Sequence, residues 1–321
     1  MNQPEFPIVL PRDVGIFSQP RWLIGDTPAW TGHIPFALWI VSAARPRTIV
    51  ELGAHYGNSF FALCQMADAL DLDCTAYAVD TWVGDEHSGA YGEDVFARVS
   101  EHNARYYGRF ASLVRSTFDD AVDHFTDGEI DLLHIDGHHT YESVKHDFES
   151  WLPRLSDRAI VLFHDVTVRE RGFGVHRLWK EIEAAHATFT FDHSHGLGVA
   201  AIGEHQSASV AALVGSNGEA AVAVRRVFAS LGEAVRNRAD EGRAAEAQRA
   251  VFMSEFDALR DTLASEAVAE RDALRVVYEA REQSLIAEYD RRIAALELEA
   301  RLAYDRAASA FDARLVEGSP S

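Results

Sequence analysis

The chain has 321 residues, of which 47% are hydrophobic and 10% aromatic, enough to pack one large or two ordinary domains. Its formal net charge of −20 repels phosphate backbones, so we expect no nucleic-acid partner. No run approaches the ~18 apolar residues of a membrane span, and the N-terminus lacks the pattern of a signal peptide. We therefore expect a cytoplasmic protein without a transmembrane segment.

Residues 1–45 are rich in proline and then become amphipathic, which predicts an N-terminal helical cap before the first strand. Two interpretations of this cap stay open. Its helix packs on the sheet, or Trp30 and His33 reach into a substrate pocket.

A glycine-containing turn joins the first predicted strand, Thr48–Leu52, to a helix. The helix is indicated by apolar residues at helical spacing: Phe60, Leu63, Cys64, Ala67 and Leu70. Gly53 and Gly57 allow positive φ or a close backbone approach, and Asn58 or Ser59 can cap the helix. The amides of that helix start would face a ligand. A dinucleotide is disfavoured because His55 and Asn58 stand where its fingerprint needs glycines, and a bare turn without a ligand is the other alternative.

Further strands are predicted at Thr75–Val79, Ser112–Arg115, from Ile130, at Ala159–Phe163, and as a closing pair at Thr188–Phe191 and Val199–Ile202. Helices alternate with most of them, which favours an α/β fold with a Rossmann-like, doubly wound, seven-stranded sheet. Four acids fall at predicted strand ends, where such folds bind ligands: Glu51, Asp80, Asp136 and Asp165. Asp80 stands where ribose hydroxyls are held, and Thr117 and Phe118 where adenine would lie.

The loop from Gly84 to Gly92 is polar and rich in glycine, so we expect it to be mobile and exposed, as a substrate loop would be. All fifteen histidines and all six tryptophans occur by residue 205. This change in composition divides the chain into a cap (1–45), a ligand-binding domain (46–205) and a tail (206–321). The tail is dominated by Ala, Arg and Glu, with irregular coiled-coil spacing, and predicts a long helix that joins a second copy or a partner protein. A solvated helix or a folded-back pair of helices are the alternatives.

The run Glu51-Leu52-Gly53-Ala54-His55-Tyr56-Gly57 resembles motif I of class I S-adenosylmethionine (SAM) methyltransferases, in the variant found in catechol-type O-methyltransferases. The resemblance implies SAM as the cofactor. The residues it implies for binding are Glu51, Gly53, His55, Gly57, Ser59, Asp80, Trp82, Thr117, Phe118 and Asp136.

Asp136, His164 and Asp165 combine hard oxygen donors with one imidazole, which suits a divalent metal ion. Catechol-type enzymes bind magnesium at corresponding strand ends, while the imidazole favours manganese, iron or zinc. The same resemblance makes His139, three residues after Asp136, the catalytic base. Purely structural roles for these histidines stay open.

Four further motifs resemble a bacterial branch of class I methyltransferases that accompanies glycosyltransferases: Asp80-Thr81-Trp82, Asp136-Gly137-His138-His139-Thr140-Tyr141, Phe163-His164-Asp165 and His195-Gly196-Leu197-Gly198. Asp157-Arg158 departs from the usual Gly-Gly. The resemblance implies O-methylation of a hydroxyl on a sugar, a surface polysaccharide or a glycosylated natural product. The alternatives are a metal-free small-molecule methyltransferase and a non-catalytic coiled-coil scaffold with a degenerate nucleotide-binding head.

Overall fold

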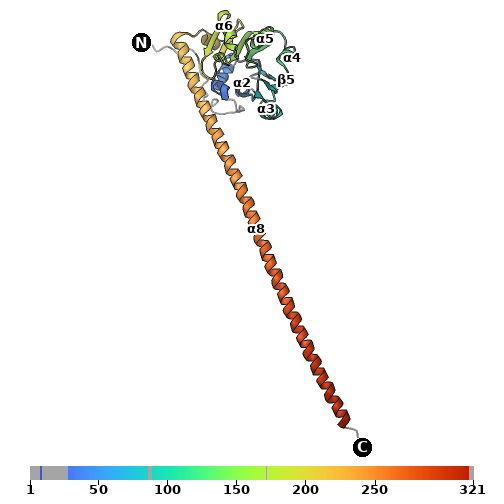
Figure 1. Cartoon of the computed structure of the whole chain (residues 1–321). Coiled ribbons are helices and arrows are strands. Elements are labelled where there is room, and N and C mark those ends of the chain that lie inside the picture. Colours follow the sequence, from blue (N-terminus) through green and yellow to red (C-terminus); the bar gives the residue numbers. More distant parts are fainter. Residues whose placement is uncertain (1–7, 9–27, 86–88, 171, 318–321) are drawn as a thin grey trace. The chain divides into compact units, whose positions relative to one another are not determined.

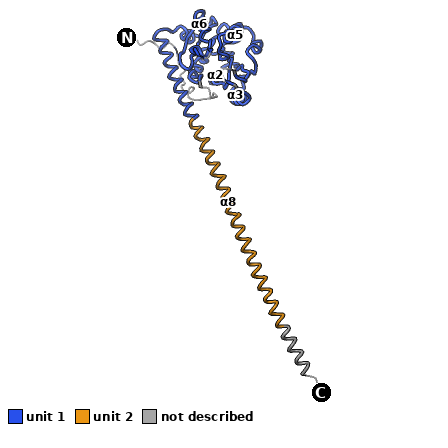
Figure 2. Tube along the Cα trace, in the orientation of Figure 1, with its two compact units in different colours: residues 1–243 blue, residues 244–321 orange. Residues whose placement is uncertain are grey.

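The computed structural model describes residues 8, 28–85, 89–170 and 172–317 (Figure 1). Most of the first 27 residues of the predicted cap, and residues 86–88 of the predicted substrate loop, lie outside the described residues. The chain divides into two compact units, residues 1–243 and 244–321 (Figure 2).

The first unit is built on a seven-stranded sheet with the order β5-β2-β1-β6-β7-β9-β8. In that order the strands are Ala111–Arg115, Thr75–Asp80, Thr48–Leu52, Ile130–Ile135, Leu155–His164, Leu197–Ala201 and Ala187–Phe191. The strands from β5 to β7 run parallel, while β9 is antiparallel to both of its neighbours. This arrangement confirms the predicted Rossmann-like sheet and its closing hairpin.

Helices cover both faces of the sheet, since successive strand residues point to opposite sides. Ile49, Leu132 and Ile160 face one core cluster, which includes residues of α1 (Ile34–Ala44) and α2 (Asn58–Ala69). Their neighbours Val50, Leu133 and Val161 face the other cluster, which includes residues of α5 (Tyr141–Trp151) and α6 (Val175–Ala185). The remaining helices of this unit are η2 (Pro28–His33), α3 (Glu93–Tyr106), α4 (Phe118–Val122), η3 (Leu152–Arg154) and α7 (Ala208–Val214).

Part of the predicted substrate loop has regular structure. Two short strands, β3 (Gly84–Asp85) and β4 (Gly89–Ala90), pair antiparallel, and Gly84 has a φ of 84° that favours glycine.

The long helix predicted for the tail is α8, which runs from Gly218 to Glu317. Its first turns belong to the first unit, because Ala221, Val224 and Phe228 are buried in the core beside α1. The compact unit thus extends to Arg243, beyond the change in composition at residue 205. Within the described residues, no helix is both long enough and apolar enough to cross a membrane.

Candidate active site

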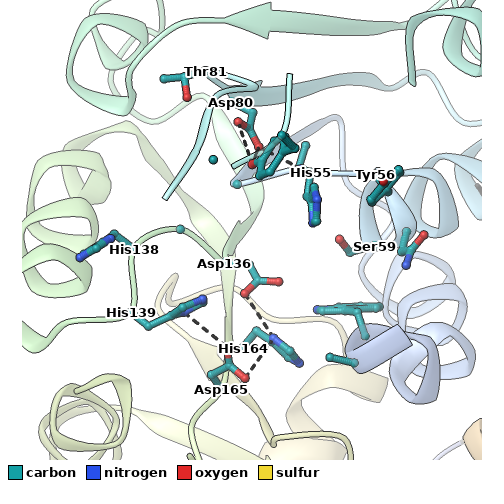
Figure 3. Close-up of a pocket in the computed structure, with 18 of the residues that line it drawn as sticks. His55, Tyr56, Ser59, Asp80, Thr81, Asp136, His138, His139, His164 and Asp165 are labelled. Carbon is teal, nitrogen blue, oxygen red and sulfur yellow. Dashed lines mark hydrogen bonds and ion pairs between the residues drawn. The ribbon is translucent and has the colours of Figure 1, made fainter. Parts of the chain in front are cut away.

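The carboxyl ends of the parallel strands border one cavity of about 470 Å³ (Figure 3). Ten of the predicted site residues line it: Gly53, His55, Ser59, Asp80, Thr117, Phe118, Asp136, His139, His164 and Asp165. Glu51, Gly57 and Trp82 do not line it and lie behind its wall. The volume falls in the range of sites that bind small molecules.

The glycine turn brings β1 against the end of β6. Gly53 has a φ of 90°, and an added Cβ there would lie 2.2 Å from the carbonyl oxygen of Asp136. Gly57, at a φ of 75°, is the N-cap of α2 and forms no side-chain cap. The prediction that Asn58 or Ser59 caps this helix is therefore wrong. His55 has a φ of 46°, in the left-handed region that glycine prefers. The histidine therefore occupies the place of the missing glycine with the backbone shape that a glycine would adopt.

Asp80 holds this turn in place. Its Oδ2 accepts the His55 backbone N–H at 2.9 Å, and its Oδ1 accepts the Trp82 backbone N–H at 2.7 Å. The hydroxyl of Tyr91 lies 3.3 Å from Oδ2. The fully buried Trp82 donates its indole N–H to the carbonyl of His55 at 3.0 Å. Asp80 thus shapes the cavity floor and still presents acceptor oxygens at its edge.

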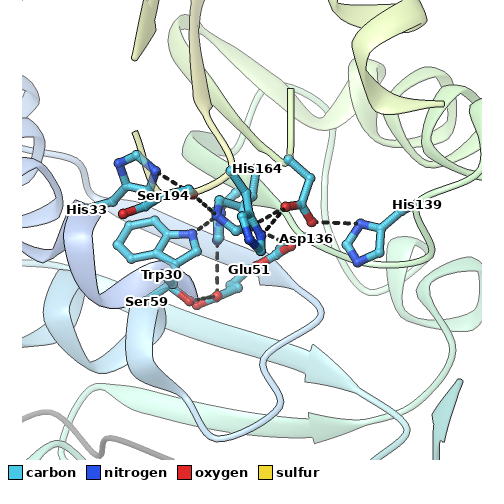
Figure 4. Close-up of polar contacts among 11 residues, drawn as sticks. Trp30, His33, Glu51, Ser59, Asp136, His139, His164 and Ser194 are labelled. Carbon is cyan, nitrogen blue, oxygen red and sulfur yellow. Dashed lines mark hydrogen bonds and ion pairs between the residues drawn. The ribbon is translucent and has the colours of Figure 1, made fainter. Parts of the chain in front are cut away.

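Glu51 lies in a buried chain of polar groups (Figure 4). Trp30 donates its indole N–H to Nε2 of His134 at 3.1 Å, and Nδ1 of His134 lies 3.0 Å from Oε1 of Glu51. Because an indole can only donate, Nε2 accepts and the imidazole proton resides on Nδ1, toward Glu51. Ser59 also donates to Oε1. Burial raises the pKa of Glu51, and the hydrogen bonds from His134 and Ser59 oppose that rise.

The cap reaches the cavity through Trp30, which lines it, and not through His33. His33 is fully buried, and its Nε2 donates to the carbonyl of Ser194 at 3.1 Å. Burial, then the nearby His164 and His193, lower the pKa of His33. The cap helix α1 packs in the core beside the sheet, and of the two cap residues expected at the pocket only Trp30 lines the cavity.

His164 sits between the two carboxylates at the ends of β6 and β7. Its Nδ1 is 3.2 Å from Oδ1 of Asp136 and 3.6 Å from Oδ1 of Asp165, and its Nε2 is 3.1 Å from the Ser194 carbonyl. Every partner is an acceptor, so both ring nitrogens carry protons. Burial opposes the charge, but Asp136 and Asp165 raise the pKa of His164 well above its ordinary value. In this arrangement His164 offers no lone pair to a metal ion, unlike the predicted ligand set.

Asp136, His139 and Asp165 form the group that could hold an ion, with ligand atoms all within 4.8 Å of one another. Nδ1 of His139 lies 3.3 Å from Oδ2 of Asp165, and its ring stacks on Phe173 at 4.5 Å with an angle of 10°. His195 approaches the other side of Asp165, with 3.2 Å between Nδ1 and Oδ1. Two carboxylates and one imidazole suit magnesium, manganese or iron.

The charge of the lining suits a cationic cofactor. Asp80, Asp136 and Asp165 contribute carboxylates, and the described residues that line the cavity include no lysine or arginine. SAM carries a sulfonium and an ammonium group, so these residues fit it. The sequence did not predict Phe173 as a lining residue, and it indicated Tyr91 only as part of the loop from Gly84 to Gly92.

A family model described as a methyltransferase domain matches residues 50–166. This part of the chain is a methyltransferase domain. The match includes Glu51, the glycine turn, Asp80 and the ends of β6 and β7, and it covers all the residues that line the cavity except Ala29, Trp30, Phe173 and His195.

An uncharacterized protein of Sinorhizobium fredii is 52% identical over 182 residues, which are 57% of this chain and 20% of that protein. The chain therefore spans about a fifth of that relative's length.

Two solved structures are similar to the chain. One is a methyltransferase of Podospora anserina with bound S-adenosylhomocysteine (13% identity, TM-score 0.42, covering 60% of this chain and 97% of that one). The other is the O-methyltransferase TomG of Streptomyces achromogenes in complex with SAM (16% identity, TM-score 0.41, covering 60% and 95%).

Proposed function

We propose that this chain is a SAM-dependent O-methyltransferase that acts on a hydroxyl group held in the cavity. The observation that carries the proposal is the meeting of a glycine turn, Asp80 and a cluster of carboxylates and histidines at one cavity of a methyltransferase domain. SAM supplies the methyl group together with its own leaving group. The protein has to orient the acceptor oxygen, exclude water and remove one proton.

The cofactor side is tested by calorimetric titration with S-adenosylhomocysteine. We expect binding, and we expect Asp80→Asn to weaken it by about tenfold or more, because the amide cannot accept both backbone N–H groups that shape the turn. Asp68→Asn is the matched control, since Asp68 pairs with Arg109 away from the cavity. No heat at millimolar ligand would end the proposal and favour the non-catalytic scaffold.

For a reaction without a metal ion, His139 is the residue we propose as the base. Since its Nδ1 faces Asp165, the lone pair is on Nε2, and the stack on Phe173 fixes the plane of the ring. We expect His139→Gln to lower kcat by about a hundredfold or more, with the affinity for S-adenosylhomocysteine unchanged. An unchanged kcat would remove His139 from this role.

We also propose a divalent cation at Asp136, His139 and Asp165, supported by the distances among their ligand atoms. Such an ion supplies positive charge that favours ionisation of an acceptor hydroxyl. In that case His139 is a ligand, and it cannot also be the base through the same lone pair. We expect stoichiometric manganese or iron by elemental analysis, and Asp165→Ala to lose it together with turnover.

A metal-free reaction is the second candidate, and the position of His164 favours it. The imidazolium between Asp136 and Asp165 already provides positive charge near the site proposed for the ion. Turnover that survives EDTA, with no metal in the purified protein, would establish this candidate and leave His139 as the base.

For the acceptor we propose a hydroxyl of a sugar, a surface polysaccharide or a glycosylated natural product. The motif resemblance supports this class, as does a lining with aromatic rings from Trp30, Tyr91 and Phe173 whose described residues include no lysine or arginine to select phosphates. Release of S-adenosylhomocysteine with neutral glycans, but not with their phosphorylated forms, is the expected result. The reverse preference would contradict the proposal.

We propose the cytoplasm as the site of the reaction, with residues 46–205 as its catalytic segment, and α8 as the element through which the protein associates. Cell fractionation tests the location.

A further inference from the structure

Five large apolar residues recur along α8 at intervals of eleven residues: Phe252, Leu263, Leu274, Leu285 and Leu296. Their side chains are 63%, 56%, 52%, 39% and 58% exposed. Eleven residues make three helical turns plus about 20°, so these side chains follow a line that winds slowly around the helix, by about 80° over the four intervals. We call this line the 11-residue stripe.

A second row accompanies the stripe, four residues later in each interval. Its members are Phe256, Ala267, Tyr278, Tyr289 and Ala300. Phe256, Tyr278 and Tyr289 are 53%, 72% and 66% exposed. The row lies roughly 40° from the stripe, so the two rows form an apolar seam two positions wide. A narrow seam of this kind is typical of a helix that pairs with one other helix.

The period also explains why the heptads in the tail are irregular. Phe252, Phe256, Leu259 and Leu263 satisfy heptad spacing, but the next heptad position on this line falls at Glu266, whereas the eleven-residue spacing continues to Leu274. An eleven-residue period corresponds to about 3.67 residues per turn and a right-handed supercoil.

In its first two intervals the seam is bordered by charged residues of opposite sign on its two sides, whereas Val277 and Glu282 stand at the corresponding places of the third interval. Glu255 and Glu266 lie roughly 60° to one side of the stripe, and Arg260 and Arg271 roughly 80° to the other. Each glutamate precedes its arginine by five residues. In a parallel pair, unlike flanks of the two helices meet, so each glutamate faces an arginine of the other copy. In an antiparallel pair like flanks meet, and the glutamates would repel one another.

We propose that α8 pairs with the α8 of a second copy of this chain, parallel and in register, with the 11-residue stripe at the interface. An identical helix supplies the same period and the complementary charges. The helix continues unbroken from Gly218 to Glu317, so the chain does not fold back on itself within it. This inference rests on the proposed association through α8 and not on methyl transfer.

Single cysteines in the full chain test the register. Leu263→Cys and Leu285→Cys should each form a disulfide-linked dimer on mild oxidation, because parallel copies place each position opposite itself. An antiparallel pair has one symmetric point and cannot link both. Gln283→Cys, nine residues after Leu274 and on the opposite side of the helix, is the control and should stay unlinked. The native Cys64 and Cys74 are buried.

Light scattering of the unmodified chain should give twice 35.6 kDa. A monomer or a trimer would overturn the proposal, as would a dimer that links at only one of the two positions. Because neither readout uses turnover, a dimer without activity would count against the proposed function alone, and an active monomer against this inference alone.

Charge exchange gives an independent test. E255R/E266R places arginine opposite arginine in a parallel homodimer, and R260E/R271E places glutamate opposite glutamate, so each variant alone should dimerise at least tenfold more weakly. Their mixture restores opposite charges at every one of these contacts and should recover the dimer. A mixture no stronger than its components would overturn the parallel arrangement.

Discussion

At the scale of single residues, Asp147 shows how burial near the cavity affects stability. It lies on α5, and an added Cβ at Gly137 would be 3.6 Å from its Oδ2. Burial raises its pKa to about 7, the nearby His146 lowers it and Asp119 raises it further. The folded protein therefore favours the neutral acid, while the unfolded chain ionises near its ordinary value of 3.8.

The stability contributed by Asp147 therefore falls as the pH rises. The favourable contribution of Asp147 to folding is present below the unfolded pKa and is lost as the pH rises toward 7. We expect Asp147→Asn to raise the melting temperature at pH 8 by several degrees, for a gain on the order of a few kcal/mol, and by much less at pH 5. Glu101→Gln, on the exposed side of α3, is the control for the loss of one carboxylate at the surface. An equal effect of Asp147→Asn at both pH values would contradict the assignment.

The acids at the strand ends were predictable from sequence, because a parallel sheet brings the carboxyl ends of its strands to one edge. The division of roles among the histidines was not. His139 and His164 both stand next to an aspartate or within three residues of one, and only the fold shows that both ring nitrogens of His164 face acceptors. No sequence pattern marked Phe173 as a site residue, since it lies in a connection between β7 and α6.

At the scale of elements, the first part of α8 packs against η2 at a pair of glycines. An added Cβ at Gly232 would lie 2.0 Å from the backbone oxygen of Gly32, between Trp30 and His33. Gly242, further along the same helix, has nothing within 4 Å of such a Cβ. Replacing glycine by alanine inside a helix stabilises it by about 1 kcal/mol when space allows.

Alanine substitutions at Gly232 and Gly242 should therefore change the stability of the protein in opposite directions. We expect Gly242→Ala to raise the free energy of unfolding by up to about 1 kcal/mol, and Gly232→Ala to lower it by about 1–3 kcal/mol because helix and cap must separate. Chemical denaturation of both variants measures this difference. If Gly232→Ala is as stable as Gly242→Ala, the close approach does not exist in solution.

Elements with strong periodicity were predictable, and the strands of the sheet agree with their predicted ranges to within a few residues. The helix α3 was not predicted, because its buried face is limited to Val95, Val99 and Asn103 between charged residues. The paired strands β3 and β4 have two residues each, which is too short for alternation to be read.

At the scale of the whole molecule, composition alone misjudges how much chain the first unit needs. The loss of histidine and tryptophan after residue 205 marks a change in composition, yet Val210, Leu213, Val224 and Phe228 are fully buried. Their partners are far away in sequence. The ring of Phe228 lies 5.4 Å from Phe36, 6.1 Å from Trp39 and 5.6 Å from Phe191.

A chain that ends at residue 205 should therefore fail to fold, whereas one that ends at residue 243 should fold. Each fully buried Val, Leu or Phe contributes about 1.5–3 kcal/mol, so the four together approach the ~5–15 kcal/mol that stabilises a typical domain. Circular dichroism melts and titration with S-adenosylhomocysteine compare the two chains, with the full protein as reference. A cooperative transition and full binding in the 205-residue chain would show that α7 and the start of α8 are dispensable. Loss of both in that chain alone would show that the methyltransferase domain needs the first turns of the helix that continues into the 11-residue stripe.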